Sequence, residues 1–441
     1  MNKDIKRIYM DYAATTPVAA EVMEEMMPYF SERYGNPSSV HGSGEEAQEG
    51  LIEARKRVAE LLNCETNEVI FTSGATEGNN SVIKSVIRNP KLNIEGTPHI
   101  IVSDIEHDCI LESAKRLMRE GLAEVSFIPV GTEGYVRVDL IKDAIKPNTV
   151  LVSVMYANNE TGVIQPIREI GAMLSEVNAE RTNKIYFHTD AAQAVNYLDC
   201  DVKRLGVDMM TLSAHKIYGP KGVGAIFVKK GTPFLTFMNG GEQEFHMRAG
   251  THNVPGIVGL GAAISRVKEN YPANEKLKEL RDMLIDGIIA AVPDAALNGS
   301  RDMRLPNNVN MRFMGAEGEA ILISLDGEGF SVSTGSACAA KSLSPSHVLK
   351  AMGLSDLDAH SSIRFSLGRY TTKEDIQKLI EVLPKIMERL RGVSGSFGEG
   401  TFWEEDQVET NRGGLPADLG CEKNNKPVED ISEHDEHFAM D

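Results

Sequence analysis

Short apolar runs that alternate with amphipathic segments constrain the fold of this chain more than any other feature of its sequence. The runs are rich in Val and Ile, and they occupy residues 68–72, 99–103, 149–156, 184–190, 208–213 and 224–228. Helical patterns lie between them, for example at 44–63 and 167–178. Nearly continuous apolar strands separated by helices are typical of a buried, mostly parallel sheet flanked by helices. The sequence therefore predicts an α/β fold.

The last third of the chain has a different pattern. Long amphipathic helices are expected at 274–292 and 373–391, with short strand candidates at 307–313 and 361–367 between them. A chain of 441 residues is also too long for one compact core. We therefore expect three regions. They are a large domain over 17–262, a small α+β domain over 1–16 and 263–392, and a flexible acidic tail over 393–441.

The charge of the chain is concentrated in that tail. Residues 393–441 hold 13 acidic and 3 basic side chains, so they carry −10 of the net charge of −18. An acidic chain is a poor nonspecific partner for nucleic acid, and we expect no direct binding of it. No run of about 18 apolar residues predicts a membrane span. The first residues lack the apolar stretch of a secretory signal, so the predicted location is cytoplasmic.

The cysteines are widely spaced and form no CxxC pair, which argues against a disulfide framework and a zinc ribbon and favours free thiols in a reducing compartment. They are Cys64, Cys109, Cys200, Cys338 and Cys421. Cys421 with His434 and His437 has only loose metal-site spacing, and no metal is predicted. Cys338 stands among Gly, Ser and Ala rather than large apolar residues, unlike a buried structural cysteine. We predict a mobile loop over 333–344 that carries it.

Polar residues follow four of the predicted strands, at the sheet edge where α/β proteins bind ligands. The stretch "FTSGATEGNN" (71–80) runs from a strand into a helix, whose first N–H groups suit an anion, although an ordinary capped helix would look the same. A single histidine such as His107 is more often structural than catalytic, and turn formation is the default interpretation of "YANNETG" (156–162). Asp190 ends a buried strand and needs a partner. Lys216 is either a Schiff-base lysine or a surface lysine beside a turn.

Together these residues match the needs of pyridoxal phosphate. Its phosphate needs N–H donors, its ring needs a stacking partner, its pyridinium nitrogen needs an acid, and its aldehyde needs a lysine. The helix start within residues 71–80, His107, Asp190 and Lys216 supply one group for each requirement. The constellation is more specific than any of its members.

The sequence also resembles a known family. The motifs "YMDYAATTP", "FTSGATEGNN", "NNETGVIQPI", "HTDAAQ", "SAHKIYGPKGVGA", "GSACAAKSLSPSHVLKAMG" and "AHSSIRFSLGRYTT" occur in the order found in cysteine desulfurases of the NifS and IscS type. The similarity extends from residue 8 to about 391. It implies the fold of PLP-dependent transferases of fold type I, a homodimer, and pyridoxal 5'-phosphate as cofactor.

The resemblance assigns roles to individual positions. Lys216 would bind the cofactor's aldehyde, Asp190 its ring nitrogen, and His107 would stack on the ring and assist proton transfer. Arg364 would clamp the substrate carboxylate with help from Asn36. The remaining cofactor contacts would come from Ala75, Thr76, Asn159, Gln193, Ser213, His215 and, toward the neighbouring subunit, Thr251.

The implied reaction converts L-cysteine to L-alanine and leaves the sulfur on Cys338 as a persulfide. That sulfur would pass to an acceptor protein, such as an iron–sulfur scaffold or another thiolation partner. A selenocysteine lyase or another PLP-dependent lyase is the alternative enzyme. A non-catalytic scaffold protein is the third hypothesis. The joint presence of four residues argues against it: Lys216, Asp190, Arg364 and Cys338.

Overall fold

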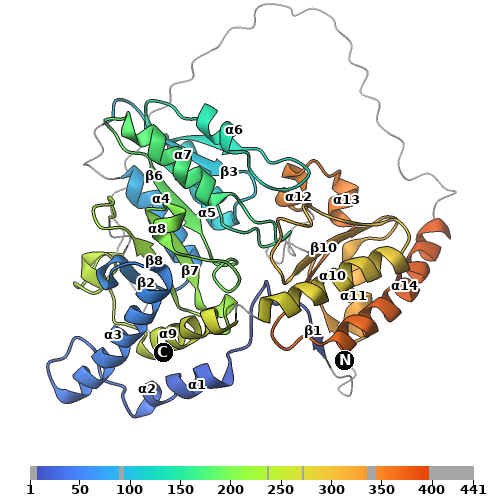
Figure 1. Ribbon diagram of the computed structural model, residues 1–441, viewed down its shortest axis with the longest axis horizontal. Coiled ribbons are helices and arrows are strands. Elements are labelled where there is room, and N and C mark those ends of the chain that lie inside the picture. Colours follow the sequence, from blue (N-terminus) through green and yellow to red (C-terminus); the bar gives the residue numbers. More distant parts are fainter. Residues whose placement is uncertain (1–6, 89–93, 236–237, 271–272, 335–343, 397–441) are drawn as a thin grey trace, which may run out of the picture. The chain divides into compact units, whose positions relative to one another are not determined.

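The predicted sheet forms the centre of the larger part of the molecule (Figure 1). The computed structural model describes residues 7–88, 94–235, 238–270, 273–334 and 344–396. Seven strands lie in the order β2-β8-β7-β6-β5-β3-β4. All neighbouring pairs are parallel except the two that involve β8. The strands are β2 Val69–Thr72, β3 His99–Ser103, β4 Glu124–Ile128, β5 Thr149–Ser153, β6 Tyr186–Asp190, β7 Met209–Ser213 and β8 Gly224–Val228.

Alternate side chains of these strands enter two separate cores, one on each face of the sheet. Ile70, Ile100 and Leu151 pack with helices on one face, whereas Phe71, Ile101 and Val152 pack on the other. Both faces are buried, which explains why the strands read as continuous apolar runs. The helices of the first face are α4 Ala75–Ile87 and α5 Asp108–Arg119, and those of the second include α3 Gly42–Leu62, α6 Val138–Asp143, α7 Ile167–Ala179, α8 Val202–Leu205 and α9 Val254–Asn270.

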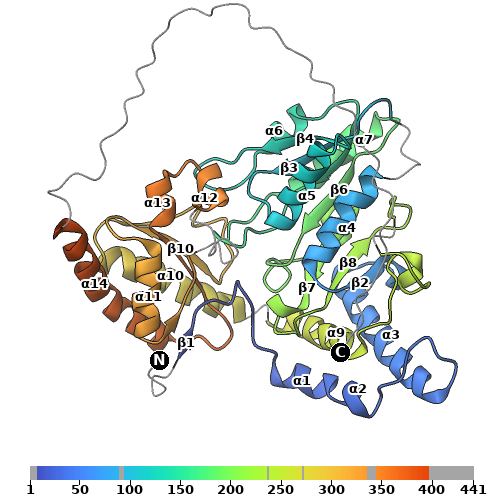
Figure 2. The same cartoon turned by 180° about the vertical axis from the view of Figure 1, so that it is seen from behind.

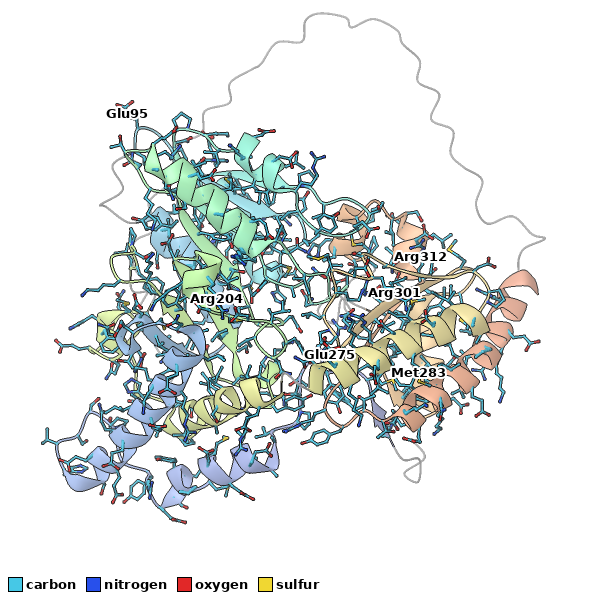
Figure 3. The ribbon with its side chains drawn as sticks, in the orientation of Figure 1. Glu95, Arg204, Glu275, Met283, Arg301 and Arg312 are labelled. Atoms are coloured by element: carbon cyan, nitrogen blue, oxygen red, sulfur yellow. The ribbon has the colours of Figure 1, made fainter. Side chains whose placement is uncertain are left out.

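A three-stranded antiparallel sheet of order β12-β10-β9 has its own core. Figure 2 shows α10, α11 and α14 around it. Ile8 and Met10 join this core, because β1 pairs in parallel with β11. Arg312, labelled in Figure 3, donates to Asn298 Oδ1 at 2.8 Å. The elements are β1 Ile8–Tyr9, α10 Ala273–Ala291, β9 Ala295–Leu297, β10 Asn308–Phe313, α11 Gly318–Gly327, β11 Phe330–Ser331, α12 His347–Ala351, α13 Asp356–His360, β12 Ser362–Ser366 and α14 Lys373–Ser396.

The remaining elements of the larger part are short. They are α1 Ala20–Met26, α2 Pro28–Ser31, and the 3-10 turns η1 Thr66–Glu68, η2 Ala214–Lys216 and η3 Glu244–His246.

The predicted α/β fold, with a mostly parallel sheet and a smaller α+β part, is confirmed. The predicted strand over 149–156 is three residues too long, and β4 and β9 were not predicted. Helix α14 continues to Ser396, past residue 393 where the tail was expected. The remainder of that tail and residues 335–343 of the predicted loop lie outside the described residues. The domain boundaries at 16/17 and 262/263 stay predictions. Among the described residues, no helix has both the length and the apolar content that a bilayer crossing needs.

Candidate active site

One cavity of about 550 Å³ collects most of the residues that the sequence singled out. It lies where β6 and β7 end, because Asp190 is the last residue of β6 and Lys216 ends the turn that follows β7. Carboxyl ends of parallel strands meet at one edge of a sheet, so this convergence follows from the topology. The predicted residues that line the cavity are Ala75, Thr76, His107, Asn159, Asp190, Gln193, Ser213, His215, Lys216 and Arg364.

Lys216 projects toward the segment that links β1 to α1. Its Nζ donates to the carbonyl oxygens of Ala13 and Ala14 at 2.5 and 2.8 Å. Gln193 Nε2 also donates to the Ala13 carbonyl, at 2.9 Å. The N-terminal segment thus forms one wall of the site and holds the lysine amine in the cavity. Its contribution was not predicted, because a backbone carbonyl leaves no signal in the sequence.

Asp190 is a buried carboxylate with two hydrogen-bond donors. Oδ2 accepts from Asn79 Nδ2 at 2.6 Å, and Oδ1 accepts from the backbone N–H of Ala192 at 2.9 Å. These bonds fix the orientation of the carboxyl group and offset the cost of burying its charge. The sequence predicted Asp190 but missed Asn79, which projects from the second turn of α4.

Two helix starts face the cavity. Helix α4 begins after Gly74, which has a φ of 152° and no side-chain cap, and the space where a Cβ would stand is open to 4 Å. The N–H groups of this first turn can therefore be reached by an anion. Helix α5 begins after His107, whose Nδ1 accepts from the backbone N–H of Cys109 at 3.2 Å.

His215 lies beside the lysine as a neutral imidazole. Burial, followed by the charges of Lys216 and Lys221, lowers the pKa of His215 to about 4. Its Nδ1 lies 3.1 Å from Thr15 Oγ1. A neutral imidazole can still offer one N–H to an anion, while the two lysines supply the positive charge.

Arg364 enters from β12 and is almost fully buried. One guanidinium nitrogen donates to Asp11 Oδ1 at 2.7 Å and another to the carbonyl oxygen of Asn159 at 3.0 Å. These two bonds fix the guanidinium plane; Asn159 lines the cavity together with Arg364, whereas Asp11 does not. The arrangement suits a planar carboxylate ligand.

A second group of cavity residues was not predicted. Burial raises the pKa of Glu160, whose Oε2 accepts from Ser346 Oγ at 2.5 Å. His347 also lines the cavity, and its Nε2 lies 2.9 Å from the carbonyl oxygen of Glu106. These contacts join segments more than 180 residues apart, so only tertiary structure reveals them.

The structure does not bring every predicted residue to the cavity. Asn36 and Thr251 are exposed and are not among its lining residues. Cys338 lies outside the described residues, as do Cys421, His434 and His437. Within the described ranges, no three His, Cys, Asp or Glu side chains gather as a metal site.

Comparisons with known proteins agree with this geometry. The family model "Aminotransferase class-V" matches residues 8–379. The cysteine desulfurase IscS of Clostridium botulinum (strain Hall) is 50% identical over 403 residues, which cover 91% of this chain and 98% of that protein. A solved NifS-like protein has a TM-score of 0.80 at 35% identity and covers 87% of this chain and 100% of its own. The structure of SspA in complex with cysteine has a TM-score of 0.72 at 37% identity, and the match covers 82% and 99% of the two chains. The chain belongs to the class-V aminotransferase family and, within it, to the cysteine desulfurases of the IscS and NifS type.

Proposed function

We propose that this desulfurase removes the sulfur of L-cysteine with the help of pyridoxal phosphate, releases L-alanine, and carries the sulfur on Cys338 to an acceptor. One observation supports this above all others. A single cavity holds a lysine amine, a buried carboxylate, three imidazoles, two helix starts and a buried guanidinium. No one of these groups is specific, but pyridoxal phosphate and an amino acid together need all of them. The SspA structure, which contains cysteine, is similar to this chain over most of its length.

The residues present fit the cofactor that the family implies. Lys216 would bond to the cofactor's aldehyde carbon, and Asp190 would accept a hydrogen bond from its ring nitrogen. The open first turn of α4, with Ala75 and Thr76, would receive the phosphate, and the missing Cβ of Gly74 leaves room for it. When bound, pyridoxal phosphate supplies an electron sink for the carbon that bears the substrate's amino group.

The substrate's carboxylate would be held by Arg364. Its guanidinium is already oriented by Asp11 and Asn159, so little side-chain entropy would be lost on binding. His107 and His347 line the same cavity as this clamp. His107 and Lys216 would then move protons between the substrate's carbon atoms.

Cys338 would act as a thiolate nucleophile. Its sulfur attacks the substrate's sulfur, the carbon–sulfur bond breaks with its electron pair remaining on the carbon side, and protonation there gives L-alanine. The flanking residues support its access to the cavity. Ser333 exchanges backbone hydrogen bonds of 2.7 and 3.2 Å with Arg364. Ser333 therefore holds the chain that leads to Cys338 beside the residue that would bind the substrate.

A second copy of the chain would complete the site. Thr251 and Asn36 carry predicted roles yet lie exposed, as residues that serve a neighbouring subunit would. Large apolar side chains are also exposed near Asn36, with Tyr34 and Val40 at 72% and 98%. Such a surface favours association. We therefore propose a homodimer that acts in the cytoplasm and passes its sulfur to a partner protein, such as an iron–sulfur scaffold.

The test compares three forms of the full chain loaded with pyridoxal phosphate. Wild type is expected to form L-alanine and sulfide from L-cysteine in the presence of a thiol reductant. Lys216→Ala and Cys338→Ala should each lower alanine formation at least a hundredfold, and D-cysteine should serve as an unreactive control substrate. Wild-type rates in Cys338→Ala would contradict the role of that cysteine, and a faster reaction with selenocysteine that persists in this variant would favour the lyase alternative.

A further inference from the structure

The cavity contains a thiol that the proposed reaction does not use. Cys109 is the second residue of α5 and lines the same cavity as His107 and Lys216. Its sulfur lies 3.1 Å from Nδ1 of His107 and 3.1 Å from Nδ2 of Asn79. A thiol in this place could compete for sulfur with Cys338, or it could hold its neighbours in position.

The hydrogen bonds around Cys109 have a definite direction. Asn79 Nδ2 carries two hydrogens, of which one donates to Asp190 and the other points to the Cys109 sulfur. The sulfur therefore accepts from Asn79 and donates its own hydrogen to Nδ1 of His107. The same Nδ1 accepts from the backbone N–H of Cys109. Nδ1 is therefore an acceptor whose single lone pair is shared by the two donors, which places the ring N–H of His107 on Nε2.

The thiol is suited to donate and unsuited to attack. Burial, followed by the charge of Asp190, raises the pKa of Cys109 to about 12. Only the thiolate is a strong nucleophile, so at neutral pH Cys109 remains a protonated hydrogen-bond donor. Asn79, its other partner, is 0% exposed and has little freedom to move away.

We propose that Cys109, held by Asn79, is a positioning residue that fixes the tautomer of His107 and does not carry sulfur. The hydrogen-bonded series then runs from Asp190 through Asn79 and Cys109 to His107. It links the carboxylate that would face the cofactor's ring nitrogen to the imidazole that would move the substrate's protons. This inference rests on the proposed function through the role given to His107.

The first test asks whether Cys109 acts through its hydrogen bond or only through the volume of its side chain. Cys109→Ser keeps a hydrogen-bond donor, whereas Cys109→Ala removes it. Cys64→Ala is the matched control, because Cys64 is a half-buried thiol whose pKa is also raised to about 12 but which does not line the cavity.

With the cofactor-loaded full chain, we expect the kcat for L-alanine formation to fall about fivefold in Cys109→Ala, the effect of one neutral hydrogen bond. KM should not change, and Cys109→Ser and Cys64→Ala should stay within about twofold of wild type. Equal rates in wild type and Cys109→Ala would overturn the positioning role. An equal loss in the serine and alanine variants would overturn the donor role.

The second test does not depend on activity. The cofactor-free chain is treated with iodoacetamide at pH 7.5, and its peptides are examined by mass spectrometry. Cys109 should stay unmodified when the folded chain is treated. It should become modified in urea, because unfolding exposes the thiol. Rapid alkylation of Cys109 in the folded chain would overturn the conclusion that its thiol is a protected, protonated donor.

The same peptide map after L-cysteine treatment of the loaded enzyme should show no added sulfur on Cys109, and a persulfide there would overturn the inference. If wild type formed no alanine, the proposed function would fail instead, and the alkylation result would still report on Cys109.

Discussion

Ser346 makes two hydrogen bonds that a single substitution, Ser346→Ala, removes. Its hydroxyl donates to Oε2 of Glu160 at 2.5 Å and accepts from the backbone N–H of Leu349 at 3.2 Å. The second bond caps α12, the helix that follows the segment containing Cys338. Ser346 and Glu160 are 7% and 3% exposed, so water cannot readily replace either bond.

The size of the effect follows from these two losses. Removing a serine N-cap costs about 1 kcal/mol. Leaving a buried acceptor without its donor costs about 1–3 kcal/mol. Because α12 has only five residues, we expect the loss to appear mainly as local opening of this helix. The lower end of the sum of these two costs is about 2 kcal/mol, which increases the equilibrium constant for opening of α12 about 30-fold.

Hydrogen exchange followed by mass spectrometry measures this opening. Amides of 348–354 should exchange about 30-fold faster in Ser346→Ala, whereas those of the central strands should not change. Ser346→Thr keeps the hydroxyl and is the matched control. Cofactor binding should be retained, because Ser346 does not line the cavity. Unchanged exchange in 348–354 would refute the reasoning, and so would an equal increase throughout the chain.

Three further predictions concern stability, each measured by urea unfolding. Burial raises the pKa of Glu106 to about 8, so between about pH 4.5 and 8 the folded state holds a proton that the unfolded state has lost. The free energy of unfolding of wild type should therefore fall, relative to Glu106→Gln, as pH rises from about 4.5 to about 8, and a pH-independent difference would contradict this. His246 is exposed with a φ of 64°, so His246→Gly should stabilise by about 0.5–1 kcal/mol; destabilisation would contradict it. Arg55→Met removes the ion pair between Arg55 and the buried Glu244 carboxylate, and it should lower the free energy of unfolding by about 3–5 kcal/mol. Adding Glu244→Gln in a double variant should restore most of this loss.

The central sheet was predictable because its strands are buried on both faces. Residues 100–102 and 225–228 are apolar without interruption, and the strands β3 and β8, over 99–103 and 224–228, contain these runs. Strand β4 was missed because it lies at the edge of the sheet and is half exposed, so Glu124 and Ser126 interrupt its apolar pattern. Edge strands carry a weaker signal for this reason.

The site was predictable where residue type and strand end coincide. Asp190 and Lys216 are recognisable because a buried charge directly after an apolar strand needs an explanation. The contact between Glu160 and Ser346 has no such signal, since each residue alone reads as part of a turn or a cap. The predicted role of Thr251 depends on a neighbouring subunit, which the sequence of one chain cannot position. Asn36, predicted to assist Arg364, is exposed and does not line the cavity.

The most direct test of the proposed function is a single turnover with a peptide mass map. The loaded enzyme is mixed with about one equivalent of L-cysteine without reductant, then quenched and digested. The account predicts close to one L-alanine per chain and a mass increase of about 32 Da, one sulfur atom, on the peptide that contains Cys338. Alanine formation with the sulfur on another cysteine, or with none retained on the protein, would contradict it.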